Sequence, residues 1–218
     1  MVGTYSGPDG DGEQLTPAGM IDAAHELANR DPALRSILER HGLPPFWART
    51  EGFPTLLHII LEQQVSLASA RAAYDRLAAA LGGDVTPATF LLLDDESLRR
   101  FGFSRQKTTY GRHLARAIQA GALDLAGLAR LDDEEVRRRL VALPGIGPWT
   151  ADIYLLMALR RPDIWPRGDL ALAVAMQRIW KLPARPSHAA QRDRSAVWSP
   201  WRSVAARLLW HNYLGGGG

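Results

Sequence analysis

Two glycines one residue apart, Gly145 and Gly147, separate two helical segments and constrain the fold more than any other feature of the sequence. Before them, apolar residues at helical spacing predict an amphipathic helix over about 133–142. After them, residues 149–159 are apolar enough for a second, mostly buried helix. Glycine permits a turn with positive φ, and its missing Cβ lets another backbone approach closely. The sequence therefore predicts a hairpin of two helices joined by a tight turn.

The ends of these two helices carry capping signals. Asp132 can cap the first helix, and Glu135 can complete a capping box with it. Pro148 suits the first turn of the second helix. The N–H groups of the turn and of this helix start would then point outward together and form an anion site, for which a DNA phosphate is the natural ligand. If the two glycines stood alone, a simple corner between helices would explain them equally well.

Composition limits the classes of protein to which the chain can belong. The formal charge is +3 and the sequence pI about 9.6, with Lys107 and Lys181 as the only lysines. The absence of cysteine excludes disulfides, thiolate zinc sites and four-cysteine iron–sulfur clusters, and the six histidines show no metal-ligand spacing. No apolar run is long enough to span a membrane. We expect a soluble cytoplasmic protein, associated with the nucleoid.

The rest of the chain also has helical character. No segment alternates polar and apolar residues in the manner of a strand, so the predicted fold is all-α. Residues 1–15 are expected to form a flexible lead-in, and residues 215–218 a flexible tail. The expected helices besides the hairpin cover residues 17–29, 32–41, 53–64, 67–81, 87–92, 95–101, 105–120, 124–130, 170–181, 187–196 and 200–214.

The segment Leu143–Ala151, together with Pro166-Arg167-Gly168-Asp169 downstream, resembles the helix-hairpin-helix superfamily of DNA glycosylases. Among its members the chain is similar to the DNA-3-methyladenine glycosylase II (AlkA-like) enzymes, over roughly residues 50–214. This resemblance implies two helical lobes that flank a DNA-binding cleft. Residues 16–52 and 182–214 would form one lobe, and residues 53–181 a helical barrel lobe with the hairpin at about 133–160.

Asp169 is the candidate catalytic residue. An aspartate before an apolar helical run is usually only an N-cap. Its position 22 residues after Gly147 matches the catalytic aspartate of the superfamily, where a carboxylate stabilises the positive charge that develops on the sugar as the base leaves. Bifunctional members that also cut the strand carry a nucleophilic lysine where this chain has Trp149, and an indole cannot form a Schiff base. The resemblance thus implies base release without lyase activity.

A flipped-out base requires a pocket, and alkylated purines are positively charged and therefore attracted to aromatic rings. By resemblance, Trp149 and Trp210 correspond to the pocket tryptophans of the family. Further pocket candidates, for which packing in the core is an open alternative, are Tyr154, Trp165, Phe46 and Trp47. Ile153 and Leu170 stand where the best-known pattern has tyrosines, which predicts a less aromatic pocket with a different substrate range.

Several residues are candidates for contact with DNA. The resemblance places Gln63 and Gln64 in a loop that faces DNA, with Gln64 filling the gap left by the flipped base. The alternative is that these two amides at a helix junction only close a turn. A solvated surface or an internal ion pair is the alternative for the basic candidates Arg105, Lys107 and Arg202. The hairpin candidates are Gly145, Ile146, Gly147, Pro148 and Thr150. No side chain indicates a metal site, but relatives suggest Na⁺ or K⁺ at the backbone carbonyls of Leu143 and Ile146.

These observations favour a monomeric, monofunctional DNA glycosylase that removes alkylated purines such as 3-methyladenine and 7-methylguanine from duplex DNA during base excision repair. One alternative is a glycosylase of the same fold for another damaged base, such as ethenoadenine or a deaminated or mismatched base. The other is a non-catalytic helix-hairpin-helix module that only binds DNA. A catalytic aspartate and a set of pocket aromatics are needed by an enzyme and not by such a module.

Overall fold

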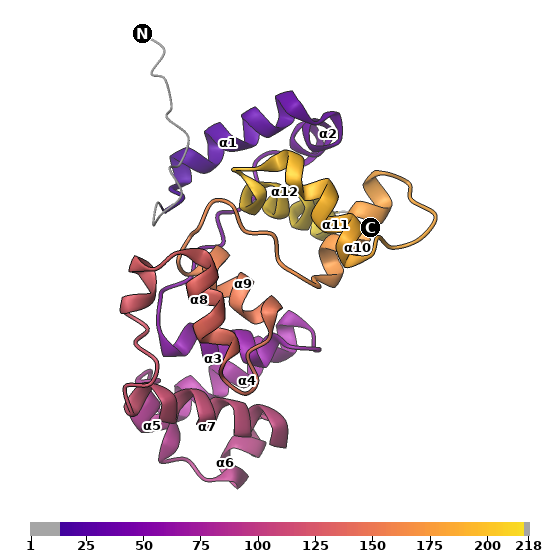
Figure 1. Ribbon diagram of the computed structural model, residues 1–218. Helices are drawn as coiled ribbons and strands as arrows, with labels where there is room; N and C mark the ends of the chain where they lie inside the picture. The colour runs from indigo at the N-terminus through magenta and orange to yellow at the C-terminus, as the bar shows by residue number, and fades with distance from the viewer. Residues whose placement is uncertain (1–13, 216–218) are drawn as a thin grey trace. The chain divides into compact units, whose positions relative to one another are not determined.

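The computed structural model describes residues 14–215, and within this range it contains helices and no strand (Figure 1). The predicted all-α fold is therefore confirmed. Within the described range the chain divides into a terminal unit, residues 14–48 and 155–215, and a central unit, residues 49–154. None of the helices in the described range is long and apolar enough to cross a membrane.

The terminal unit is built around its last helix, α12. Its helices are α1 (Pro17–Arg30), α2 (Pro32–His41), α10 (Leu170–Ile179), α11 (His188–Ser195) and α12 (Arg202–Gly215), with a 3₁₀ turn at Ala196–Trp198. Helices α1, α2 and α10 all pack against α12, whose residues 203–210 are buried without interruption. A helix that is apolar on all sides must be covered on all sides, which explains this central position.

One charged residue lies inside that core. Arg207 has no exposed surface, and its guanidinium donates to the carbonyl oxygens of Phe46 at 2.9 Å, Ser203 at 3.1 Å and Leu156 at 3.0 Å. Burial lowers the pKa of Arg207 to about 10, so the side chain is still protonated at neutral pH. The three carbonyls replace the water that the guanidinium loses, and Arg207 thereby ties α12 to two other segments of the unit.

The central unit surrounds α3, the buried helix that the sequence predicts. Its helices are α3 (Phe53–Glu62), α4 (Leu67–Ala80), α5 (Pro87–Leu91), α6 (Asp95–Phe101), α7 (Arg105–Gln119), α8 (Asp133–Val141) and the start of α9 (Pro148–Met157), with a 3₁₀ turn at Gly127–Arg130. Helices α4 and α7 pack on α3, and α5 and α6 pack on α7. The apolar run of α3 is almost completely buried, as predicted.

A buried polar cluster lies on α3. Glu62 accepts two bonds from Arg49, at 3.0 and 2.7 Å, and its carboxylate lies 3.8 Å from the ring of His58. His58 stacks on Tyr74, with 4.7 Å between ring centroids. Burial lowers the pKa of His58, although the negative charge of Glu62 acts in the opposite direction. His58 therefore resists protonation in the folded state.

Local signals predicted most helix starts correctly. Thr16 accepts from the N–H of Gly19 at 3.0 Å, and the side chains of Asp31, Ser66 and Ser104 cap α2, α4 and α7 as predicted. Residues 124–130 form only a short 3₁₀ turn, and the last helix begins at Arg202 rather than at Pro200. The side chain that bonds the first N–H of that helix is the distant Asp163, at 3.1 Å, which local sequence does not indicate.

The boundaries of the units and ends differ from the prediction. Residues 155–181 belong to the terminal unit rather than to the barrel, because α10 packs on α12 and the N–H of Ile164 donates to Ser203 at 2.9 Å. Leu15 is buried and bonds to the carbonyl of Arg160 at 2.7 Å, so the expected lead-in does not extend that far. Gly215 is the last residue of α12. The rest of the expected lead-in, 1–13, and of the tail, 216–218, lies outside the described residues.

Candidate functional site

The two predicted hairpin helices are present as α8 and α9, with the turn at residues 142–147 between them. Asp132 caps α8 by accepting from the N–H of Glu135 at 2.8 Å. The predicted capping box is wrong in its second half, because the Glu135 carboxylate binds Arg138 and Arg139 instead. These bonds lower the pKa of Glu135 to about 2. The Glu135 carboxylate thus forms ion pairs with arginines of the next turn and does not cap the start of α8.

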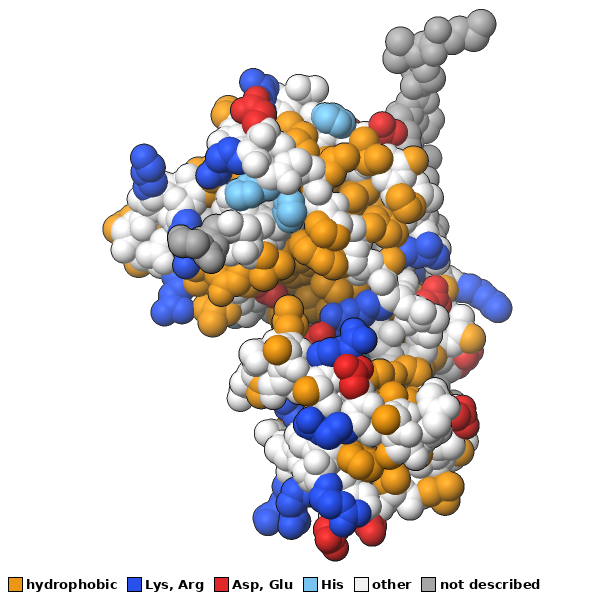
Figure 2. Space-filling model, turned by 180° about the vertical axis from the view of Figure 1, so that it is seen from behind, with side chains coloured by type: hydrophobic (Ala, Val, Ile, Leu, Met, Phe, Trp, Pro, Cys, Tyr) orange, Lys and Arg blue, Asp and Glu red, His pale blue; other side chains and the backbone are white. Residues whose placement is uncertain are grey.

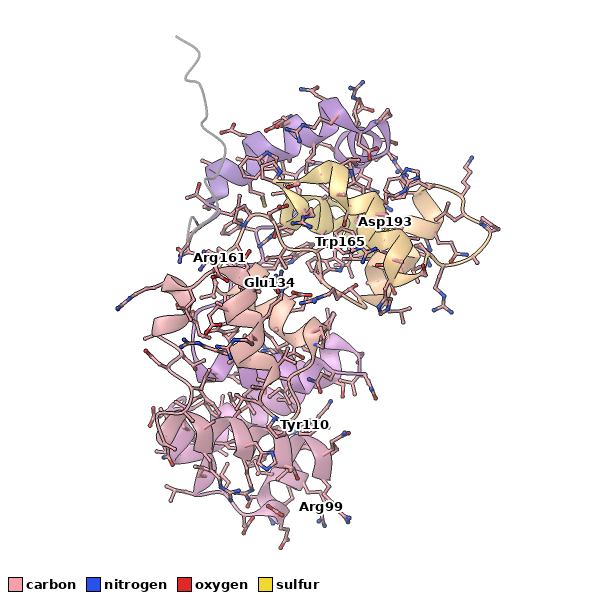
Figure 3. The ribbon with its side chains drawn as sticks, viewed as in Figure 1. Arg99, Tyr110, Glu134, Arg161, Trp165 and Asp193 are labelled. Carbon is pink, nitrogen blue, oxygen red and sulfur yellow. The ribbon has the colours of Figure 1, made fainter. Side chains whose placement is uncertain are left out.

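The two glycines of the turn have different physical roles. Gly145 has a φ of +91°, and a Cβ added there would lie 2.1 Å from the ring of Tyr110, so that ring packs directly on the glycine (Figure 3). Gly147 has no positive φ, and a Cβ added there would meet nothing within 4 Å. The first glycine is therefore needed by the fold, whereas the second leaves open space at the start of α9. Among the described residues, no group accepts a hydrogen bond from the N–H of Gly147.

Gln63 holds the turn from the side of α3. Its amide nitrogen donates to the carbonyl of Gly145 at 2.8 Å and to the hydroxyl of Thr150 at 2.9 Å. Gln63 and Thr150 thus fix the turn to the start of α9, and their contact with DNA stays a prediction. Gln64, in contrast, is exposed and has a φ of 58°, a conformation that is uncommon for a residue with a side chain.

The three basic candidates for DNA contact also differ in whether the side chain has a partner within the protein. Lys107 is half-buried and donates to the carbonyl of Leu61 at 2.6 Å, which satisfies an acceptor at the end of α3. Burial lowers the pKa of Lys107. Arg202 forms a two-pronged ion pair with Asp163, with both distances 2.8 Å. Both side chains thus have internal partners, while Arg105 is exposed in the first turn of α7.

Asp169 lies in the terminal unit at the start of α10. It is buried, with 8% of its surface exposed, and its Oδ1 accepts from the N–H of Leu172 at 2.8 Å and from the indole Nε1 of Trp210 at 3.2 Å. The first bond is the N-cap that the sequence indicates. The second comes from a residue predicted only as a wall of the base pocket, and together they fix the direction of the carboxylate.

The predicted pocket aromatics separate into two groups. Trp47 packs edge-on against Trp210, with ring centroids 6.4 Å apart, and Trp210 in turn bonds to the carboxylate of Asp169. Trp165 is buried against Trp198, with 5.4 Å between centroids.

Two further candidates have structural contacts. Phe46 lies 5.4 Å from the guanidinium carbon of the buried Arg207. Tyr154 is completely buried, accepts a bond from the N–H of Gly52 at 3.0 Å, and has its pKa raised by burial to about 12. Packing explains Trp165, Phe46 and Tyr154, whereas Trp149 is partly exposed in the first turn of α9.

Metal binding at the hairpin stays a prediction. Within the described residues no group of three histidine, aspartate or glutamate side chains could hold a metal ion. The carbonyl of Leu143 accepts from the N–H of Ile146 at 3.1 Å and so lies on the inside of the turn. A carbonyl has two lone pairs, and a monovalent cation at Leu143 and Ile146 is compatible with this bond.

Tyr110 is the site residue that sequence reasoning missed. It lies on α7, 35 residues before the glycine on which its ring packs, and it accepts a bond from the amide of Gln106 at 2.6 Å. A tyrosine on an amphipathic helix reads as ordinary packing. The signal that was available was Gly145 itself, because a glycine in such a turn can indicate close approach by another group.

Comparisons with known proteins agree with this geometry. The family model described as HhH-GPD superfamily base excision DNA repair protein matches residues 57–200. The Bacillus subtilis protein YfjP, provisionally named a DNA-3-methyladenine glycosylase, is 30% identical over 187 residues, which cover 83% of this chain and 65% of YfjP. DNA-3-methyladenine glycosylase 1 of Schizosaccharomyces pombe is 30% identical over 165 residues, which cover 74% of this chain and 72% of that protein.

A solved structure of 3-methyladenine DNA glycosylase from Schizosaccharomyces pombe, in complex with abasic DNA, matches with a TM-score of 0.79 and 26% identity. The match covers 87% of this chain and 95% of that one. The chain spans just under two thirds of the length of YfjP, at 65%. The resemblance to the AlkA-like enzymes is confirmed by these relatives. On its fold, its hairpin and this family match, the chain belongs to the HhH-GPD superfamily of base excision DNA repair proteins.

Proposed function

We propose that this protein is a monofunctional DNA glycosylase that hydrolyses the N-glycosidic bond of alkylated purines in duplex DNA. The observation that carries the proposal is the carboxylate of Asp169, which is buried and oriented by two N–H donors. The named relatives are 3-methyladenine glycosylases, and one of them is solved with abasic DNA, the product of base removal.

The chemistry follows from the position of this charge. As the bond between C1′ and the purine nitrogen breaks, its electron pair leaves with the base and positive charge develops on the sugar. The carboxylate of Asp169 stabilises that charge, and water adds to C1′ and gives up its proton to this carboxylate or to solvent. The aromatic pair Trp47 and Trp210 beside this carboxylate suits a positively charged purine, with about 0.5–2 kcal/mol for each cation–π contact.

The absence of lyase activity is part of the proposal. A lyase needs an amine that attacks C1′, and the first turn of α9 offers the indole of Trp149 instead. The chain has two lysines, and the amine of Lys107 is bonded to the carbonyl of Leu61. Borohydride should therefore trap no covalent complex with damaged DNA, and strand breaks should appear only after alkali. A trapped complex would contradict this part of the proposal.

Base release from methylated duplex DNA tests the main proposal. Asp169→Asn should abolish the release of 3-methyladenine and 7-methylguanine while the variant still binds DNA, because asparagine caps a helix as well as aspartate does. The matched control is Asp94→Asn, since Asp94 is an exposed N-cap that accepts from Ser97 at 2.7 Å. Release should be unchanged in this control. Unchanged release in Asp169→Asn would remove the catalytic assignment.

A glycosylase for another damaged base is the second candidate, and one observation favours it. Leu170 directly follows Asp169 and stands where the best-known pattern has a tyrosine. Its aliphatic side chain is 61% exposed. Cation–π attraction acts on positively charged purines and not on neutral lesions. A less aromatic pocket therefore weakens the binding of charged purines more than the binding of neutral lesions. Release of ethenoadenine or hypoxanthine in preference to 3-methyladenine, measured on matched duplexes, would select this candidate.

A further inference from the structure

The segment 178–194 of the terminal unit, here called the basic segment, carries an unusual charge. It contains Arg178, Lys181, Arg185, Arg192 and Arg194 against a single carboxylate, Asp193. Its net charge is thus larger than the +3 of the whole chain. All five cationic side chains are exposed, on the end of α10, on α11 and on the connection between them. Figure 2 shows blue side chains projecting at the left edge of the view, where this connection lies.

The partners of these cations distinguish them from many other arginines of the protein. Elsewhere, exposed arginines such as Arg71 and Arg100 pair with carboxylates on the same helix, at 2.8 and 3.0 Å. In the basic segment, Arg194 instead lies over the ring of Trp180 at 4.2 Å, and Arg178 lies over Tyr213 at 5.5 Å. An aromatic ring orients a guanidinium without neutralising it.

The remaining cations of the segment are also poorly neutralised. Among the residues that the structure describes, Lys181 and Arg185 form no ion pair with any carboxylate. Arg192 pairs with its neighbour Asp193 at 3.2 Å, and both side chains are at least 70% exposed (Figure 3). An exposed pair of this kind contributes little to stability and exchanges readily for another anion. The segment therefore keeps most of its charge for a partner.

Helix α11 of the basic segment begins beside the loop that carries Asp169. A Cβ added to Gly168 would lie 3.3 Å from the ring of His188, so the first residue of α11 packs next to the loop that carries Asp169. The 8 residues of α11 extend about 12 Å from that point, at about 1.5 Å per residue. One strand of DNA rises about 3.4 Å per nucleotide, so this distance corresponds to about three nucleotides.

We propose that the basic segment binds phosphates of the DNA strand that flanks the extruded nucleotide, as a second phosphate-binding surface separate from the hairpin. The inference rests on the proposed function, because the sugar of the damaged nucleotide must lie over Asp169 for α11 to reach its neighbours. Contacts to phosphates position a strand without reading its sequence, so the surface serves lesions in any context. Polyanionic DNA is favoured over a small anion because the cations are spread along a helix and a loop instead of converging on one point.

The test is the salt dependence of binding. We would titrate duplex DNA that contains a stable abasic-site analogue, by fluorescence anisotropy, between about 50 and 300 mM salt. The variant Lys181→Gln/Arg185→Gln loses two exposed charges that make no ion pair. The control Arg71→Gln/Arg100→Gln loses two exposed charges from pairs within helices. Thermal denaturation of both checks that the fold is intact.

The slope of log K against log salt should fall by about 1.8 in the first variant, since each phosphate contact contributes about 0.9. At about 0.1 M salt this corresponds to a loss of up to roughly 60-fold in affinity. The control should change the slope by less than about 0.5. Equal slopes in the two variants would overturn the inference.

Two parallel measurements separate this inference from others. Base release by the unmodified protein tests the proposed function directly, and a protein that releases no base but shows the slope change would retain the phosphate surface alone. Binding to vesicles of phosphatidylglycerol tests a membrane as the partner. If the Lys181→Gln/Arg185→Gln variant loses vesicle binding and keeps the DNA slope, the segment serves a lipid surface and the inference is wrong.

Discussion

The different roles of the two hairpin glycines give the most stringent test of the phosphate-binding turn. Gly147 has open space around its Cα and no positive φ, so the Cβ of Gly147→Val would meet no atom within 4 Å. Its side chain would instead occupy the place where a phosphate approaches the N–H groups at the start of α9. Hydrogen bonds to a charged group contribute about 1.5–3 kcal/mol each, so the loss of one weakens DNA binding by roughly 10- to 150-fold.

Gly145 gives the opposite expectation. At a φ of +91° an alanine is strained by about 1–2 kcal/mol, and its Cβ would overlap the ring of Tyr110 at 2.1 Å. Gly145→Ala should therefore destabilise the central unit by about 2–4 kcal/mol, with the overpacking added to the strain. In Gly145→Ala/Tyr110→Ala the clash is gone, so the second substitution should cost less in this background than in the unmodified protein.

Two assays on the same proteins separate the roles. Urea denaturation gives the free energy of unfolding, and anisotropy with several unrelated duplexes gives the affinity for DNA. We expect Gly147→Val to keep its stability within about 0.5 kcal/mol and to lose affinity equally for every duplex. Affinity equal to that of the unmodified protein would refute the phosphate-binding turn. Normal stability of Gly145→Ala would refute the packing argument.

Three further outcomes are expected. Trp210→Phe keeps a ring but removes the N–H donor that orients Asp169, so base release should slow by about 10- to 100-fold. Arg202→Ala removes the ion-pair partner of Asp163, so it should lower the melting temperature and leave the salt slope of DNA binding unchanged. A smaller slope would show that Arg202 contacts phosphate. Burial lowers the pKa of His58, so as the pH falls below about 6.5 the unfolded chain takes up a proton before the folded protein does. Protonation therefore favours unfolding, and the melting temperature should drop between pH 7 and pH 5. The drop should be smaller in His58→Gln.

Features that depend on neighbouring residues were predictable from the sequence. The caps Thr16, Asp31, Ser66 and Ser104 act within three residues of themselves, and each forms the predicted bond. The apolar run of α3 is buried because its composition leaves it no polar face. The hairpin was predictable for the same reason, since its glycines, proline and caps are adjacent in the chain.

Features that depend on distant residues were not predictable. Gln63 reads as a polar loop residue, but its amide lies within 2.8 Å of a carbonyl 82 residues away. Arg202 reads as a basic residue at a helix start, but its partner Asp163 is 39 residues earlier. Long polar side chains can reach many partners, and only the folded backbone selects one. This explains why single basic residues were the weakest part of the predicted site.

Asp169, the proposed catalytic residue, can be compared with a second N-cap aspartate of the terminal unit. Asp31 is also an N-cap, and it too accepts from a tryptophan of the terminal unit, Trp198 at 2.9 Å. In Asp31 the cap uses Oδ1 and the tryptophan uses Oδ2, so both oxygens are engaged. In Asp169 the cap and Trp210 both bond to Oδ1. The two aspartates share the same local signal, and under the proposed function Asp31→Asn should leave base release unchanged where Asp169→Asn abolishes it.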